Sequence, residues 1–203
     1  MSLSRFTAAL AALSATLFAG CAAHAQTEPV PPGFTMERTG TVTDFAYFEG
    51  GWTTAQRRLR QRGVGSHDWE EFPATLCMTP YLDGAAAVDE LYMPTFHRAG
   101  LTVRVFDRER RQWSIYWINS ATGRLDPVPV VGGFANNRGE FYANDTVDGR
   151  PIKVRYLWLI TDHSHARWEQ AFSYDNQTWE TNWTADFTRA DTSAVCDHGR
   201  PRR

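Results

Sequence analysis

Short turn signals recur at nearly regular intervals along this chain, and they constrain its fold more than any other feature. Between Trp52 and Arg189 they are RGVGSHD, PYLDG, HRAG, DRERR, SATGR, ANNRG, VDGR, TDHSH and YDNQ. The clearest is Asp148-Gly149, because Asp-Gly favours the two-residue turn that joins antiparallel strands. No segment between these turns is long enough for a parallel crossover helix. The sequence therefore predicts strands that follow one another by short turns.

Ten strands fit between these turns, and strands connected in this way form an antiparallel meander. We expect them in or near residues 52–61, 68–79, 85–92, 100–106, 111–119, 128–135, 139–146, 151–160, 165–174 and 178–189. A sheet this wide removes its exposed edges by closing on itself. The predicted fold is all-β, an antiparallel up-and-down barrel of about ten strands. A short N-terminal helix is expected before it, with Thr43 as N-cap and Gly50 or Gly51 as the stop.

Alternation within the strands predicts which side chains face the barrel interior, because successive residues point to opposite faces. The inward set is rich in aromatic residues: Trp113, Trp117, Tyr156, Trp158, Trp168, Trp179, Trp183 and Phe187. The same alternation places Arg104, Arg155 and Glu169 on the outer face. These three, with Asp89 and Glu90, are charges that a barrel must either expose to water or bury in pairs.

The N-terminus predicts export. Arg5 precedes an Ala- and Leu-rich apolar run followed by small residues, so residues 1–25 are expected to be a signal peptide. Cleavage after Ala25 would release a soluble protein to the periplasm or the medium. Alternatively, LFAGC resembles a bacterial lipobox, which would lipidate Cys21 and hold the protein at the outer membrane. Residues 26–40 are expected to be a flexible lead-in, residues 41–190 the barrel domain and residues 191–203 a polar tail.

Two cysteines, Cys77 and Cys196, remain once Cys21 is removed or lipidated. An even pair in an oxidising compartment favours one disulfide, although spacing alone also allows two free thiols. The formal net charge of −2 and the pI of about 6.3 give no basic footprint for nucleic acid. The chain has no H-E-x-x-H, C-x-x-C or G-x-S-x-G motif, so neither a metal, a cofactor nor a serine nucleophile is expected. Asp126, Asp145 and Asp148 are candidates for a barrel mouth, although turn roles account for Asp126 and Asp148.

The chain resembles the calycin superfamily, which includes lipocalins, fatty-acid-binding proteins and nitrobindin-like haem barrels. Gly50 and Trp52 on the first strand and Arg189 at the end of the last strand carry the resemblance. In lipocalin-type barrels such a Trp plugs the closed end beneath an Arg from the final strand. WEEFPATLCMTP, RRQWSIYWIN, GRLDPVPVVGGF and ARWEQAFSYDNQTWETNW look like segments of an uncharacterised bacterial family of lipocalin-like domains. That resemblance implies a fold but no activity, and about ten strands would depart from the eight of the lipocalins.

A barrel of this size can leave room for a small ligand. The leading hypothesis is therefore an exported protein that binds a small apolar or aromatic molecule in its lumen. The candidate ligand-binding residues are Trp113, Trp117, Tyr156, Trp158, Trp168, Trp183, Arg104 and Glu169. One alternative is a cofactor-free lyase or isomerase in the same lumen, with Tyr116 or Tyr156 and Glu169 as proton-transfer groups beside an Arg. The other is a structural envelope protein whose lumen is filled by side chains.

Overall fold

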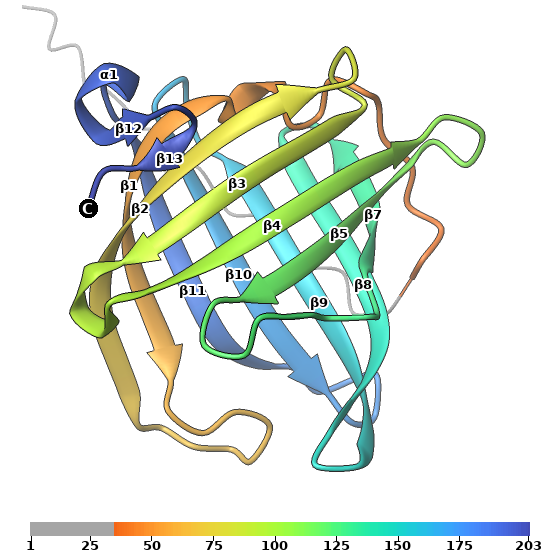
Figure 1. The fold of residues 1–203 in the computed structure, drawn as a ribbon. Helices are drawn as coiled ribbons and strands as arrows, with labels where there is room; N and C mark the ends of the chain where they lie inside the picture. The colour runs from red at the N-terminus through yellow and green to blue at the C-terminus, as the bar shows by residue number, and fades with distance from the viewer. Residues whose placement is uncertain (1–34) are drawn as a thin grey trace, which may run out of the picture. The chain divides into compact units, whose positions relative to one another are not determined.

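Ten strands of the computed structural model pair in sequence order and close into an antiparallel barrel (Figure 1). The structure describes residues 35–203. The strands are β1 (Gly50–Leu59), β2 (Trp69–Tyr81), β3 (Ala86–Met93), β4 (Arg98–Asp107), β5 (Gln112–Asn119), β7 (Val130–Ala135), β8 (Arg138–Val147), β9 (Arg150–Ile160), β10 (His165–Ser173) and β11 (Glu180–Arg189). Pairing of β1 with β11 closes the ring. A two-residue strand, β6 (Arg124–Leu125), pairs only with the end of β5.

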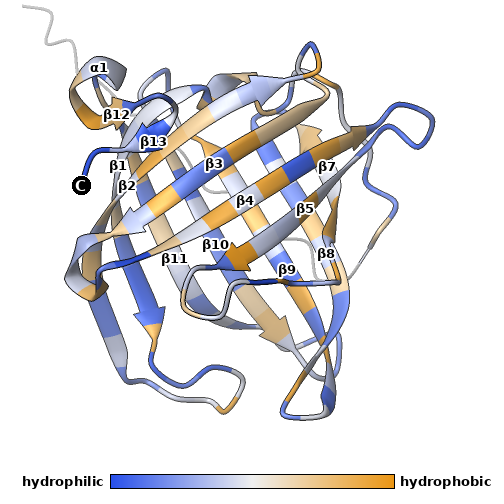
Figure 2. Ribbon diagram, in the orientation of Figure 1, coloured by the Kyte–Doolittle hydropathy of each residue, from blue (hydrophilic) through white to orange (hydrophobic). Residues whose placement is uncertain are grey.

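The predicted all-β barrel is confirmed, and each expected strand is present with ends that differ by at most two residues. Local signals account for this agreement. Asp148 and Gly149 have positive φ angles of 50° and 78° and alone connect β8 to β9. Such angles are what the two-residue hairpin turn requires. Figure 2 shows hydrophobic and hydrophilic residues alternating along the strands.

The expected N-terminal helix is only one turn of 3-10 helix, η1 (Ala46–Phe48). Thr43 does not cap it, because Phe45 occupies the N-cap position and no side chain caps the turn. The nearby Asp44 carboxylate instead accepts hydrogen bonds from the backbone N–H of Thr41 and of Phe134 in β7, each 3.1 Å long. The polar residues here therefore attach the segment to the barrel wall instead of starting a helix.

A cluster of buried aromatic side chains fills the end of the barrel at which η1 lies. Trp52 is fully buried, and its indole N–H donates to the Phe48 carbonyl at 3.0 Å. The guanidinium of Arg189, the direct cross-strand partner of Trp52, lies 4.2 Å from the centre of its ring. Phe45 and Phe48 enter from η1 and its N-cap. This end of the barrel is closed.

Both ends of the described chain are attached to the barrel. In the predicted lead-in, residues 35–40 have no regular structure, but the Gln112 side-chain amide donates to the Met36 carbonyl at 2.6 Å. The predicted signal peptide, Cys21 and residues 26–34 lie outside the described residues. Within residues 35–203, no helix combines the length and apolar character needed to cross a bilayer.

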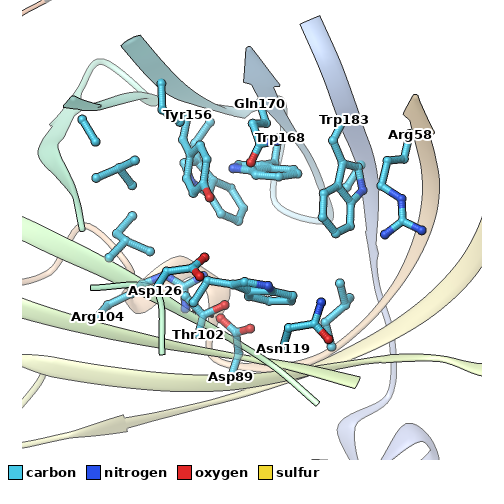
Figure 3. A pocket seen from close by; sticks show the side chains of 18 of the residues that line it. Arg58, Asp89, Thr102, Arg104, Asn119, Asp126, Tyr156, Trp168, Gln170 and Trp183 are labelled. Carbon is cyan, nitrogen blue, oxygen red and sulfur yellow. Dashed lines mark hydrogen bonds and ion pairs between the residues drawn. The ribbon is translucent and has the colours of Figure 1, made fainter. Parts of the chain in front are cut away.

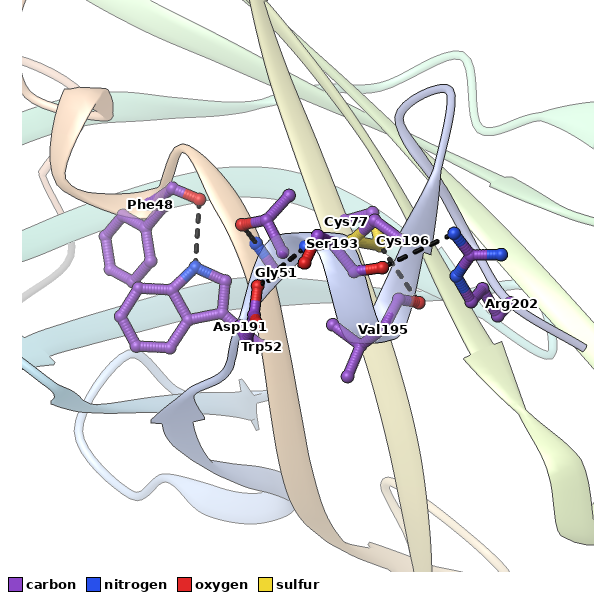
Figure 4. The surroundings of a disulfide bond; sticks show 10 residues. Phe48, Gly51, Trp52, Cys77, Asp191, Ser193, Val195, Cys196 and Arg202 are labelled. Carbon is purple, nitrogen blue, oxygen red and sulfur yellow. Dashed lines mark hydrogen bonds between the residues drawn. A yellow bond between two sulfur atoms is a disulfide. The ribbon is translucent and has the colours of Figure 1, made fainter.

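The C-terminal segment 191–203, expected to be a polar tail, instead forms secondary structure. It contains a short helix, α1 (Thr192–Val195), and a hairpin of β12 (Cys196–Asp197) and β13 (Arg200–Pro201). A disulfide joins Cys196 to Cys77 in β2, and the backbone N–H of Gly51 donates to the Thr192 hydroxyl at 2.9 Å (Figure 4). The segment is thereby fastened over β1 and β2.

One strand breaks the expected alternation. The pairing of β10 with β11 slips between Gln170 and Ala171, which leaves Asn182 as the extra residue of a β-bulge. Trp183 and Phe187 face the interior as predicted. For the residues that precede the bulge, however, the inward and outward sides are exchanged. Trp179, predicted to face inward, therefore lies on the outer face, where the Arg155 guanidinium lies 4.5 Å from its ring.

Candidate ligand-binding lumen

A cavity of about 390 Å³ lies inside the barrel, beyond the closed end (Figure 3). This volume lies within the usual range of small-molecule sites, about 300–1,000 Å³. Its aromatic lining comes from four strands: Trp117 of β5, Tyr156 and Trp158 of β9, Trp168 of β10 and Trp183 of β11. The barrel is therefore not filled by its own side chains.

The aromatic lining is arranged edge to face. Tyr156 and Trp168 have ring centres 5.0 Å apart at 80°, and Trp168 and Trp183 have centres 5.7 Å apart at 77°. Aromatic pairs prefer such geometries. Trp183 is further held by a 2.8 Å hydrogen bond from its indole N–H to the Gln56 side chain. Trp117 lies against β4 at Gly100, where a Cβ atom would come within 1.7 Å of its ring.

A buried ion pair lies on the opposite wall of the cavity. Arg104 of β4 and Asp89 of β3 are only 3% and 1% exposed, and Nη1 of Arg104 donates to Oδ2 of Asp89. The Arg104 guanidinium also lies 4.7 Å from the centre of the Phe45 ring. Figure 3 shows this polar wall, with Thr102 beside the pair, across the cavity from Tyr156, Trp168 and Trp183. The ion pair thus lies across the lumen from Tyr156, Trp168 and Trp183, whereas Trp117, the cross-strand partner of Thr102, is on the same side as the pair.

The inward position of Arg104 corrects the prediction that alternation would place it outside. No bulge causes the difference, because the pairing of β4 with β3 and β5 is continuous. Instead β4 presents its polar face, with Thr102 and Arg104, to the lumen and leaves Val105 outside, 43% exposed. Asp89, directly opposite Thr102 in the β3–β4 pairing, supplies the charge that makes burial of the guanidinium tolerable.

Several buried polar atoms of lining side chains lack a hydrogen-bond partner within the described part of the chain. They are Oδ1 of Asp89, Nε of Arg104, Nε1 of Trp158 and Nε1 of Trp168. The indoles of Trp52, Trp113 and Trp183 all donate to a protein oxygen. Because an unmade buried hydrogen bond costs about 1–3 kcal/mol, such atoms call for an explanation. All four atoms have almost no accessible surface, so these side chains line the cavity through their other atoms.

The mouth of the cavity is the barrel end opposite η1, where the β1–β2 loop and the β8–β9 turn lie at the bottom of Figure 1. Arg62, Asp126 and Asp145 line it and are exposed. Arg58, nearby, forms an ion pair of 2.5 Å with Glu70. Asp148, the third mouth candidate, belongs to the β8–β9 turn and does not line the cavity.

The environment of the mouth shifts the pKa values of several side chains in the direction that favours their neutral forms. Desolvation lowers the pKa of Arg62, and the nearby Arg58 charge lowers it further. Desolvation raises the pKa of Asp126, and the Asp145 charge raises it further. Burial, followed by the Asp126 charge, raises the pKa of the Tyr156 phenol well above its ordinary value. Tyr156 therefore enters the lumen as a neutral hydroxyl.

Six of the eight candidate ligand-binding residues line the cavity: Trp117, Tyr156, Trp158, Trp168, Trp183 and Arg104. Trp113 does not, because it is fully buried in the closed end, where its indole N–H donates to the Thr41 carbonyl at 2.9 Å. Glu169 does not either, since it accepts a 2.7 Å hydrogen bond from Arg167 on the outer face.

Sequence reasoning did not identify Arg58 and Arg62 as lining residues, and it considered Asp89 only as a charge to be exposed or paired. Alternation in β3 could have indicated Asp89, which shares a face with Ala87 and Leu91. For Arg62 there was no signal, because it lies in the loop that follows β1.

No model of a known protein family matches the sequence, and no curated protein matches it significantly. Among residues 35–203, no group of three or more His, Cys, Asp or Glu side chains is placed to hold a metal ion.

Proposed function

We propose that this protein is exported and binds a small, largely apolar or aromatic molecule in the lumen of a calycin-like barrel. The observation that carries the proposal is the cavity of about 390 Å³, lined by aromatic rings and by a few polar side chains. Apolar walls with a few placed polar groups are the usual composition of a small-molecule site. The Trp52–Arg189 stacking at the closed end supports the calycin-like assignment, and the N-terminal sequence pattern supports export.

Neither alternative has an equivalent observation in its favour. The enzyme hypothesis placed Glu169 as a proton-transfer group in the lumen, but Glu169 lies on the outer face, bonded to Arg167. A filled structural barrel would lack the cavity that separates the aromatic and polar walls. Ligand binding therefore remains the function that the geometry supports best.

Native mass spectrometry tests the proposal on protein recovered gently from the envelope of its own host. A discrete mass that is lost on denaturation is expected and would reveal the class of the bound molecule. Binding of the neutral probe N-phenylnaphthylamine, followed by its fluorescence, gives an independent measurement. Trp168→Leu should weaken this binding by about two- to tenfold, since each aromatic contact contributes about 0.5–1.5 kcal/mol.

Trp69→Leu is the matched control. Trp69 lies in β2 but does not line the cavity, and its ring packs instead under the Arg57 guanidinium at 4.3 Å. The control should leave probe affinity unchanged. Host protein without a bound mass, together with no probe binding by the wild type, would refute the proposal.

A further inference from the structure

We propose that the outer face of β3, β4 and β5 is the surface through which two copies of this protein form a reversible dimer. The proposal concerns the outside of the barrel, so it does not depend on what the lumen binds. Three features carry it: the apolar character of this face, its lack of cover within the described part of the chain, and the charges at its two ends.

The outward-pointing side chains of these three strands are almost all apolar. Directly opposed residues of paired strands lie on the same side of a sheet, so the pairings define rows of neighbours. In the central row, Val88 of β3 lies opposite Val103 of β4, and Val103 lies opposite Tyr116 of β5. With the adjacent rows, the apolar set, here called the β4 face, is Ala86, Val88, Leu101, Val103, Val105, Tyr116 and Ile118, with Tyr81 of β2 and Leu125 of β6 at its edges and Glu90 and Ser114 as polar exceptions.

The β4 face is not part of the core. None of its members belongs to the buried hydrophobic cluster or packs against it. Tyr81, Val105 and Leu125 are 52%, 43% and 50% exposed. The lumen side of β4 carries Thr102 and Arg104 instead, so this strand turns its apolar side outward. Contiguous apolar area of this kind commonly marks a site of interaction.

The rest of the described chain covers the neighbouring walls but not the β4 face. On one side the C-terminal segment lies against β2 and β3, where the Arg203 guanidinium donates to Glu90 at 2.5 Å. On the other side the lead-in packs on β7, where a Cβ atom at Gly133 would come within 2.5 Å of the Gly40 backbone. Figure 1 shows β3, β4 and β5 between these two covers, with no described segment in front of them.

A second copy fits this face in shape and size. Each of the three strands is paired on both sides, so a partner must pack on the face and not along an edge. Another flat sheet face is the natural complement, since two such faces pack about 10 Å apart. With strands about 4.8 Å apart and same-side residues about 6.6 Å apart, four strands and three rows span about 400 Å². Two copies with a polar rim would bury a total of about 1,000 Å², which suits a weak, specific dimer.

The charges at the two ends of the β4 face suit an antiparallel copy. Asp83 and Asp107 are exposed at the closed end, where the β4–β5 turn adds charges of both signs, and Arg98 and Arg124 are exposed at the mouth end. A two-fold axis across the strands brings the acidic residues of each copy to the basic residues of the other. The uncharged centre brings no like charges together. A bilayer, in contrast, favours a rim of basic residues alone.

Sedimentation velocity over a series of protein concentrations tests the proposal on the host-purified wild type. We expect a reversible dimer that is half-formed at about 10–100 μM, since an interface of this size is weak. Val103→Lys and Val105→Lys should each weaken dimerisation at least about tenfold, because an unpaired ammonium is costly to bury. Val64→Lys is the matched control. Val64 is 63% exposed in the β1–β2 loop, outside the β4 face, so this variant should dimerise as the wild type does.

A wild type that stays monomeric over this concentration range overturns the proposal, and that measurement requires no variant to fold. A dimer that persists in both variants of the β4 face also overturns it, because the contact would then lie elsewhere. Circular dichroism checks that each variant keeps the β fold. Co-sedimentation with vesicles of phosphatidylethanolamine and phosphatidylglycerol tests the other occupant. A monomer that binds these vesicles and loses that binding in Val103→Lys would place a bilayer on the face and refute the dimer.

Discussion

Asp89→Asn is expected to lower the free energy of unfolding by about 3–5 kcal/mol, the usual effect of removing one partner from a buried ion pair. The structure indicates that the loss of stability lies at the upper end of this range. Arg104 and Asp89 are 3% and 1% exposed, and the only other hydrogen-bond partner of the Arg104 guanidinium within the described residues is the Met78 sulfur at 3.9 Å. Asparagine retains an acceptor oxygen but not the charge, so the guanidinium stays desolvated without compensation.

The double variant Asp89→Leu with Arg104→Met separates the loss of the pair from the loss of one partner. Replacing both charges by apolar groups of similar volume is often neutral, or stabilising by about 1–4 kcal/mol. We therefore expect the double variant to be at least as stable as the wild type.

Urea unfolding followed by circular dichroism measures these effects in the oxidised protein. With a slope of about 2 kcal/mol/M, a loss of 3–5 kcal/mol moves the midpoint down by about 1.5–2.5 M. Glu71→Gln, at the exposed Glu71–Arg57 pair, should change stability by no more than about 1 kcal/mol. If Asp89→Asn cost no more stability than this control, the Arg104 guanidinium would have to be solvated by water in the lumen, which would contradict its burial.

Two further predictions concern the C-terminal segment and the mouth. Replacing both Cys77 and Cys196 by Ser opens a cross-link between residues 119 positions apart, and it should lower stability in urea by about 2–5 kcal/mol; an unchanged midpoint would contradict this. Desolvation raises the folded-state pKa of Asp126 above its ordinary 3.8, so the unfolded chain loses this proton first and Asp126 reduces stability as pH rises through that interval. Asp126→Asn should therefore gain stability relative to the wild type between acidic and neutral pH in a urea series, and a difference that is constant with pH would show that Asp126 titrates normally.

Local signals along the chain were sufficient to place the strands of this protein. Turn chemistry is local, so Asp148-Gly149 and similar signals placed the strand ends to within two residues. Alternation in β9 and β10 likewise identified Tyr156, Trp158 and Trp168 as inward-facing, because a single buried face leaves a clear period of two.

Strand pairing and barrel closure, in contrast, set which way each strand face points and how deep each residue lies. In the segment LTVRVFD, alternation defines two faces but does not indicate which of them points to the lumen. Only the pairing of β4 with β3, which sets Thr102 opposite Asp89, turns Arg104 inward. The bulge at Asn182 turns the Trp179 side chain to the outer face. The slip in pairing that produces the bulge is not encoded in the sequence of β11 alone. Trp113 and Trp117 share a face of β5, yet one seals the closed end and the other lines the cavity. Depth along the barrel depends on how all ten strands close, which is a property of the ring and not of any one segment.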